Sequence, residues 1–241
     1  MKRRILFLQL PPVSPDGRPA RENHPLGGAC LAVAARSEPG LDGFDIAFLD
    51  RRTADEGSDR AIIEAIAAAR PGVLGVTLYV WNVVRTVHVI REARKLLPDL
   101  AVIAGGPEVV PGRRELFEWG IDVAAPGEGE IPFVRILRLL AGGCDPRRAA
   151  DFAGVPGLLL PPERPGEPPV FTGLGPPLAS LDQLESPYIA GWLDAADDRF
   201  LYLETTRGCK FHCTCGSRAP GGCLWSGPNE ALCDASPRDP R

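Results

Sequence analysis

The stretch VLGVTLYVWNVVRTVHVIREARKLLPDLAVIA, residues 73–104, contains an apolar strand, a helix and a second apolar strand. Residues 73–78 and 101–104 are short apolar runs, which is typical of buried strands. Between them, apolar residues recur at helical spacing, namely Val83, Val87, Ile90, Ala93 and Leu97. A strand, a helix and a strand in this order predict parallel strands in one sheet.

The same alternation extends in both directions from this stretch. Apolar strands are also expected at residues 5–10, 45–49 and 122–125, each bounded by glycine, proline or charged residues. Helical patterns occupy residues 26–36, 59–70, 84–97, 113–119 and 131–141. The pattern therefore predicts an α/β domain over residues 1–145, with a doubly wound, parallel, five-stranded sheet.

A proline-rich linker is expected after this domain, over residues 146–198. Its prolines exclude a helix or a central strand, although the linker has room for a small hairpin. Residues 200–204 then form a short apolar run that predicts one new buried strand. The final residues, 216–241, show neither strand nor helix periodicity.

Composition narrows the classes of partner. The chain has 27 Lys and Arg against 31 Asp and Glu, a net charge of -4, so no nucleic-acid partner is expected. The apolar run at the N-terminus ends at Pro11 and Pro12, too early for a signal peptide or a membrane span. The expected location is therefore cytoplasmic, without a membrane partner.

Three loops are expected to form the ligand-binding edge of the sheet, because ligands of open α/β sheets bind at the carboxyl ends of the strands. These loops are residues 79–82 (Tyr-Val-Trp-Asn), 105–108 (Gly-Gly-Pro-Glu) and 127–130 (Gly-Glu-Gly-Glu). The first strand is followed by two prolines and not by the glycine-rich turn of a dinucleotide fold. Glycines and flat aromatic rings at this edge favour a large, mostly apolar ligand.

The three loops, in this order, resemble the Rossmann-like cobalamin-binding domain that precedes the radical domain in cobalamin-dependent radical S-adenosylmethionine proteins. This resemblance implies that cobalamin is the cofactor. It also implies a set of cofactor-binding residues at the strand ends, namely Tyr79, Trp81, Asn82, Gly105, Gly106, Pro107, Glu108, Gly127 and Glu128.

His24 is a further candidate for cofactor binding. Glu22, His24 and Gly27 have the spacing of the Asp-x-His-x-x-Gly motif by which methionine-synthase-type corrinoid carriers place an imidazole on cobalt, with Glu in place of Asp. In the radical family, the matching Pro-Leu-Gly turn commonly lacks the histidine and leaves the lower face of cobalt without a protein ligand. Both readings of His24 stay open.

A cysteine-rich segment begins at residue 209. Thr205, Thr206, Arg207 and Gly208 lead into Cys209, Cys213 and Cys215, and clustered cysteines of this kind indicate a metal site more than disulfides. The segment resembles the Cys-x-x-x-Cys-x-aromatic-Cys motif that opens the partial α/β barrel of the radical family, here over residues 199–215. The resemblance implies a 4Fe-4S cluster, S-adenosylmethionine and a reductant protein as a partner.

The cysteine segment also departs from the family. The third cysteine comes one residue early and the aromatic residue is missing, so Cys223 is an alternative third ligand. A zinc site made of Cys209, His212, Cys213 and Cys215 is a second reading. Only a short remainder follows, and the match fails after Thr214, which suggests a frameshifted end of a truncated barrel.

Two functions follow from these patterns. The first is cobalamin binding by the N-terminal part of a radical S-adenosylmethionine protein, which transfers methyl groups or rearranges an unknown substrate. The second is a standalone corrinoid-binding module, or an inactive truncated product without catalysis. A flavodoxin-like or response-regulator-like domain fits the strand count but not the loops, since neither an acidic cluster nor a phosphate loop follows the first strand.

Overall fold

The computed structural model describes residues 3–12, 23–164, 166–194 and 201–207. Its strands are β1 (Arg3–Leu8), β2 (Phe44–Phe48), β3 (Val73–Thr77), β4 (Ala101–Gly105), β5 (Val123–Ala124), β6 (Leu159–Leu160) and β7 (Val170–Phe171). Its α-helices are α1 (Leu26–Arg36), α2 (Arg51–Glu56), α3 (Asp59–Ala69), α4 (Val83–Leu96), α5 (Glu115–Glu118) and α6 (Glu130–Ala141). Two short 3-10 helices, η1 (Ala149–Phe152) and η2 (Leu181–Gln183), follow α6.

The strands form one sheet in the order β2-β1-β3-β4-β5-β6-β7. The first five strands are parallel, as the alternation predicts, with Gly75 opposite Ile103 and Thr77 opposite Gly105. β6 and β7 pair antiparallel at one edge, so the sheet has seven strands and not the five expected. These two strands form a small hairpin, which the sequence analysis allowed for within the proline-rich linker.

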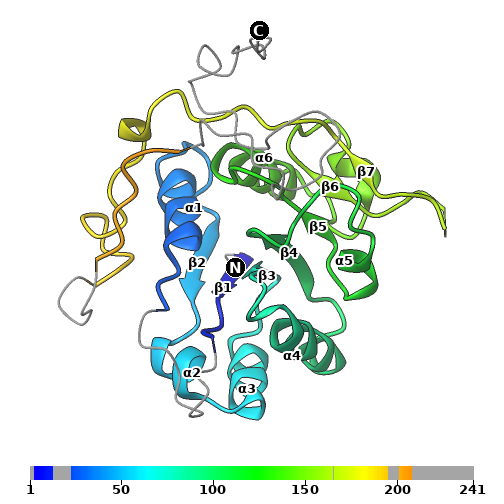
Figure 1. The fold of residues 1–241 in the computed structure, drawn as a ribbon, viewed down its shortest axis with the longest axis horizontal. Helices are drawn as coiled ribbons and strands as arrows, with labels where there is room; N and C mark the ends of the chain where they lie inside the picture. The colour runs from blue at the N-terminus through cyan, green and yellow to red at the C-terminus, as the bar shows by residue number, and fades with distance from the viewer. Residues whose placement is uncertain (1–2, 13–22, 165, 195–200, 208–241) are drawn as a thin grey trace, which may run out of the picture.

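Helices cover both faces of the sheet (Figure 1). Side chains on one face of the strands, such as Leu74 and Val76, pack with Ile62 of α3 and Ile90 of α4. The opposite core contains Phe7 together with buried residues of α1 and α6. The second core also takes in Phe152, Val155, Leu158 and Leu160, so the packed structure continues beyond residue 145, the expected end of the domain.

Two differences from the expected elements have simple physical reasons. Helix α2 is absent from the prediction because its six residues, RRTADE, carry no apolar period, and only Ala54 is buried. Asp50, which caps α2 by accepting a hydrogen bond from the Thr53 N–H, is the local signal for this helix. The strand expected at residues 200–204 is not present over residues 201–204, where Leu201 and Leu203 are exposed and no strand in the described part of the chain pairs with them.

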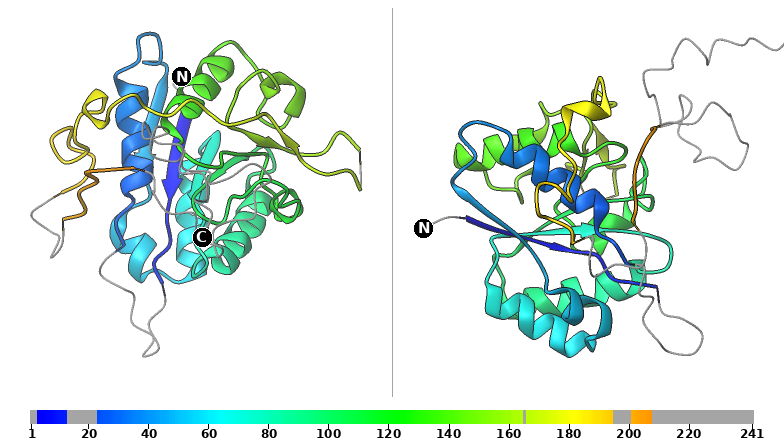
Figure 2. Two further views of the ribbon diagram at one scale, coloured as in Figure 1. Left: turned by 45° about the horizontal axis from the view of Figure 1, so that its top comes forward. Right: turned by 90° about the vertical axis from the view of Figure 1, so that its left-hand side faces the viewer.

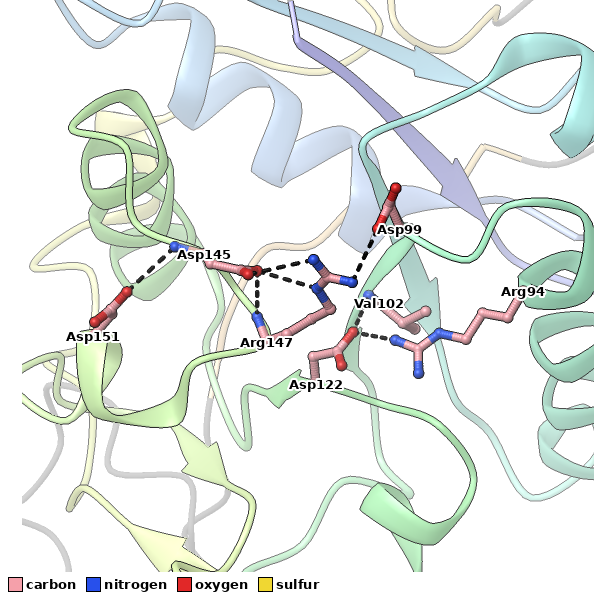
Figure 3. Close-up of polar contacts among 7 residues, drawn as sticks. All are labelled: Arg94, Asp99, Val102, Asp122, Asp145, Arg147 and Asp151. Carbon is pink, nitrogen blue, oxygen red and sulfur yellow. Dashed lines mark hydrogen bonds and ion pairs between the residues drawn. The ribbon is translucent and has the colours of Figure 1, made fainter.

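Polar contacts fix the amino ends of β4 and β5, at the edge of the sheet opposite the ligand loops (Figure 3). The Asp122 carboxylate accepts hydrogen bonds from the Val102 N–H, at 2.7 Å, and from Arg94 of α4. Nearby, Arg147 reaches both Asp99 and Asp145. These contacts connect α4, β4 and the segment after α6. They therefore stabilise the sheet at the end opposite its ligand-binding edge.

Candidate functional site

A cleft of about 710 Å³, including its open mouth, lies between the sheet and the two helices α1 and α6. Alternate residues of a strand point to the same face, so Val73, Gly75 and Thr77 of β3 form its floor together with Ile103 and Gly105 of β4. The floor follows the length of β3, which is about 13 Å at the usual rise per residue. Its walls include Gly28 and Leu31 of α1, and Gly129, Glu130, Phe133 and Ile136 at or within α6.

Three glycines on or beside the floor have different physical roles. A Cβ atom on Gly75 would lie 2.6 Å from the ring of Phe7, so this glycine makes room for the neighbouring aromatic side chain. A Cβ atom on Gly105 would meet nothing closer than 3.9 Å, so the missing side chain at this position leaves volume in the cleft open. Gly106 has a φ of 102° and turns the chain beneath Leu78, a conformation that L side chains rarely adopt.

The loop after β3 places two aromatic rings beside this edge. Tyr79 and Trp81 stack with their centroids 4.4 Å apart and their planes 8° apart, and Trp81 is 51% exposed. Burial raises the pKa of Tyr79, so its hydroxyl stays protonated at neutral pH. Val80 and Val84 are also exposed, so the start of α4 presents an apolar surface around the stacked pair.

Asn82 holds this loop in place. Its side chain is 1% exposed, accepts a hydrogen bond from the Tyr79 N–H at 2.8 Å and donates to the carbonyl groups of Leu10 and Thr77, both at 3.1 Å. The amide therefore connects the ends of β1 and β3 to the start of α4.

The loop after β4 contributes a proline and an acid. Pro107 is exposed beside the mouth of the cleft, whereas Glu108 forms an ion pair with Arg113 and donates its backbone N–H to the Leu78 carbonyl at 3.1 Å. This pairing directs the Glu108 carboxylate towards the protein. Glu108 therefore contributes to the shape of the loop through its backbone.

The loop after β5 carries two acids that meet one arginine. Glu128, which follows the positive-φ Gly127, and Glu130 at the start of α6 accept hydrogen bonds from Arg207 at 3.1 and 2.6 Å. Glu128 also accepts the Leu178 N–H at 3.1 Å. Burial alone would lower the pKa of Arg207, but its hydrogen bonds with Glu130 and Glu204 raise it, so the guanidinium stays charged.

His24 lies in a second cleft, next to the first and lined by Gln9, Asp50 and Asp55 among others. The histidine is buried, and its ring lies 4.7 Å from the ring of Tyr202. Neighbouring Asn23 bonds to Gln9 and to Asp55, which fixes the chain that leads into α1. The structure thus places His24 just before α1 begins, outside the first cleft. Because Gly28, Gly75, Gly105 and Gly129 line that first cleft, we call it the glycine-lined cleft.

The predicted cluster ligands Cys209, Cys213 and Cys215 lie outside the described residues, as do the alternative ligands His212 and Cys223. Within residues 3–12, 23–164, 166–194 and 201–207, no group of three or more His, Cys, Asp or Glu side chains is placed to hold a metal ion. Burial and the nearby Glu130 raise the pKa of the Cys30 thiol to about 11, so it stays protonated and unreactive at neutral pH.

Several residues of the site were not among the predicted ones. Gly75 and Thr77 share the floor with Gly105, and the period of two along β3 was the available signal for them. Leu31, Phe133 and Ile136 line the walls from the inner faces of α1 and α6. The sequence motif places Arg207 only in the approach to the cysteines, and its ion pairs join residues about 80 positions apart, which no local pattern reveals.

No helix in the described part of the chain combines the length and apolar character needed to cross a membrane.

Comparison with known proteins identifies the family of this fold. The B12 binding domain family matches residues 17–137, which include α1, β3, β4 and most of α6. The cobalamin-dependent radical SAM methyltransferase TokK of Streptomyces tokunonensis is 33% identical over 154 residues, covering 60% of this chain and 21% of the relative. A 2-(S-pantetheinyl)-carbapenam-3-carboxylate methyltransferase of Streptantibioticus cattleyicolor is 34% identical over 154 residues, covering 59% of this chain and 21% of the relative.

Solved structures share the fold. The radical S-adenosylmethionine methyltransferase TsrM of Kitasatospora setae, with tryptophan substrate and a SAM analog bound, aligns with a TM-score of 0.52 at 21% identity, covering 71% of this chain and 30% of TsrM. The cobalamin-dependent S-adenosylmethionine radical enzyme OxsB, with aqua-cobalamin bound, aligns with a TM-score of 0.56 at 15% identity, covering 79% of this chain and 25% of OxsB. The chain spans about a fifth of the length of the curated relatives it matches. Because the family match covers half of its residues, the chain belongs to the B12-binding domain family.

Proposed function

We propose that this chain binds cobalamin, with the nucleotide tail in the glycine-lined cleft and the corrin ring over the carboxyl ends of β3 and β4. The observation that carries the proposal is the cleft between β3, β4 and the helices α1 and α6, which Gly105 leaves open. Cobalamin combines a broad, flat ring with one narrower tail, so the proposal assigns the tail to the cleft and the ring to the loops at its mouth. Largely preformed, mostly apolar clefts of this kind are typical cofactor sites.

The lining of the cleft agrees with this ligand. Thr77 and Glu130 supply the polar side chains among residues that are otherwise apolar or glycine. Outside the cleft, the exposed Trp81 ring and Pro107 offer flat apolar surface at the edge where the ring would lie. Gly106 and Gly127 line the cleft itself. In the proposal Glu128 completes the edge beside them, while Asn82 and Glu108 act by holding their loops.

We further propose that the complete protein is a cobalamin-dependent radical S-adenosylmethionine methyltransferase. When bound, cobalamin would supply a cobalt that can carry a methyl group. The residues of this chain would hold the cofactor and exclude water from it. A 4Fe-4S cluster on Cys209, Cys213 and Cys215, S-adenosylmethionine and a reductant protein belong to the same proposal. Methyl transfer is favoured over rearrangement because both curated relatives are named methyltransferases.

Titration of the whole chain with hydroxocobalamin, followed by desalting, tests the binding function. We expect one cobalamin per chain to remain with the protein, measured by visible absorbance. No retained cobalamin would reject the proposal. Anaerobic reconstitution with iron and sulfide tests the cluster separately, and stoichiometric zinc without acid-labile sulfide would reject it in favour of a zinc site.

Replacing Trp81 with alanine should weaken cobalamin binding by about threefold to tenfold, because an aromatic contact contributes roughly 0.5–1.5 kcal/mol. The side chain is half exposed, so the free energy of unfolding should change little. Equilibrium titration measures the first quantity and urea denaturation the second. Leu96→Ser at the opposite end of α4, which is also exposed, serves as the control, and equal effects of both variants would remove Trp81 from the site.

Replacing His24 with alanine should leave the visible spectrum of bound hydroxocobalamin unchanged. The reason is that the ring is buried against Tyr202 and lies outside the glycine-lined cleft. The measurement is the absorbance spectrum between about 300 and 600 nm, where a change of cobalt ligand is visible. A shifted spectrum in the variant would instead establish His24 as the ligand that its spacing resembles.

A further inference from the structure

The floor of the glycine-lined cleft has an outer, a middle and an inner level. At the outer level, Thr77 lies opposite Gly105 at the carboxyl ends of β3 and β4. At the middle level Gly75 lies opposite Ile103, and Val73 at the start of β3 is the inner floor residue. Successive levels are two residues apart, which is about 7 Å along a strand. In the right-hand view of Figure 2 the strand arrows point towards the ligand-binding edge, where the outer level lies.

The wall formed by α6 follows the same levels. Glu130 is the first residue of this helix, at the ligand-binding edge, and Phe133 and Ile136 follow at intervals of three residues. Each interval advances about 4.5 Å along the helix axis. All three residues line the cleft. The wall therefore leads from a carboxylate at the mouth to an aromatic ring and then to an aliphatic side chain farther inside.

Polar side chains are confined to the outer end of the cleft. Among its described lining residues, only Thr77 and Glu130 have polar side chains, and both lie at the outer level. The middle and inner levels are lined by apolar side chains that are at most 7% exposed, namely those of Phe7, Val73, Ile103, Phe133 and Ile136. A ligand group seated at these levels is therefore removed from water and surrounded by apolar side chains.

The backbone of the floor is also occupied. β3 lies between β1 and β4, and β4 lies between β3 and β5, so both are inner strands of the described sheet. Around Gly75 and Ile103 their N–H and C=O groups are engaged in ladders with the neighbouring strands. In the described part of the cleft, a polar ligand group at the middle level thus meets neither a polar side chain nor a free backbone group of the floor.

We propose that the cleft selects corrinoids by the lower base of their nucleotide tail, accepting the apolar dimethylbenzimidazole of cobalamin and discriminating against a purine such as adenine. This inference rests on the proposed cobalamin site, in which the tail enters the cleft. The base ends the tail, so it lies at the middle level, and the ribose that carries it lies beside Thr77 and Glu130. Dimethylbenzimidazole presents two methyl groups to its surroundings. Adenine carries an amino group and additional ring nitrogens, which would lose their hydrogen bonds to water there.

The test compares the affinities of the whole 241-residue chain for cobalamin and for pseudocobalamin, which has adenine as its lower base. Equilibrium titration should give a dissociation constant for pseudocobalamin that is roughly tenfold higher or more, because the buried polar groups of adenine stay unpaired. Adenine binds cobalt more weakly than dimethylbenzimidazole does, so displacement of the base from cobalt would by itself favour pseudocobalamin. A preference for cobalamin therefore originates in the cleft.

Ile103→Thr adds a hydroxyl group at the middle level and so gives adenine a hydrogen-bond partner. We expect the ratio of the two dissociation constants to fall by about threefold or more. Val102→Thr is the matched control, because Val102 is the neighbouring residue of β4 and packs in the core on the opposite face of the sheet. Its ratio should stay within about twofold of that of the unaltered chain. Urea denaturation of both variants checks that the fold is intact.

The outcomes separate selection of the base from cofactor binding itself. Equal affinities of the unaltered chain for the two compounds, or tighter binding of pseudocobalamin, would overturn the selection and leave the proposed function standing. A ratio in folded Ile103→Thr equal to that in Val102→Thr would place the base away from the middle level and would also overturn the inference. No binding of either compound would defeat the proposed function and the selection with it.

Discussion

Leucine in place of Gly105 should weaken cobalamin binding by roughly 30-fold or more while the domain stays folded. The free space beside Gly105 is the cleft itself, since a Cβ atom there would meet nothing closer than 3.9 Å. A leucine side chain would therefore occupy the volume proposed for the nucleotide tail. Overpacking a well-fitted site costs about 1–3 kcal/mol, and the upper part of that range corresponds to the expected loss. Equilibrium titration with hydroxocobalamin measures it.

Gly43→Leu is the control for this substitution. Gly43 precedes β2 at the amino edge of the sheet, away from the cleft, and a Cβ atom there would also meet nothing within 4 Å. This variant should bind cobalamin as tightly as the unaltered chain. Urea denaturation of both variants checks that the fold is intact. If Gly105→Leu bound cobalamin normally, the ligand would lie elsewhere.

Aspartate in place of Asn82 should lower the free energy of unfolding by about 3 kcal/mol or more at neutral pH. The Asn82 amide donates to the carbonyls of Leu10 and Thr77, whereas a carboxylate would place a buried negative charge against both oxygens. Burial raises the pKa of such a group, so the loss should be largest above that pKa and should shrink as the pH falls and the carboxyl gains a proton.

Urea denaturation at about pH 8 and about pH 5 measures this effect. Gln183→Glu adds the same charge at an exposed position of η2 and should change the unfolding free energy by less than about 0.5 kcal/mol. Equal stability of Asn82→Asp and the unaltered chain would mean that the amide does not connect β1, β3 and α4 as described.

The strand and helix alternation was predictable because each element carries its own periodic signal. Helix α1 coincides with the expected residues 26–36, and β3 and β4 differ from the expected strands by one residue at one end. Helix α2 is short and polar, and its burial depends on tertiary packing that its own residues do not encode. The core residues Phe152 and Leu158 lie in a proline-rich segment, where only contact with α6 and the sheet makes them buried.

The position of the cleft was predictable from the sequence, but the contacts of the individual side chains around it were not. The rule for open α/β sheets placed the loops after β3, β4 and β5 at one edge, where the cleft lies. Asn82 stands in such a loop, yet the structure directs its amide to three protein partners, a choice that no sequence pattern distinguishes from a ligand contact. The ion pair between Arg207 and Glu130 joins residues 77 positions apart, and contacts at that separation emerge only from the folded chain.

A comparison of cobalamin with cobinamide, which keeps the corrin ring but lacks the nucleotide tail, tests the central claim most directly. Equilibrium titration of the whole chain with each compound gives the two dissociation constants. If the tail occupies the cleft along β3, the chain will bind one cobalamin and will bind cobinamide at least roughly tenfold more weakly. Equal affinity for the two compounds, or no binding of cobalamin, would contradict the account.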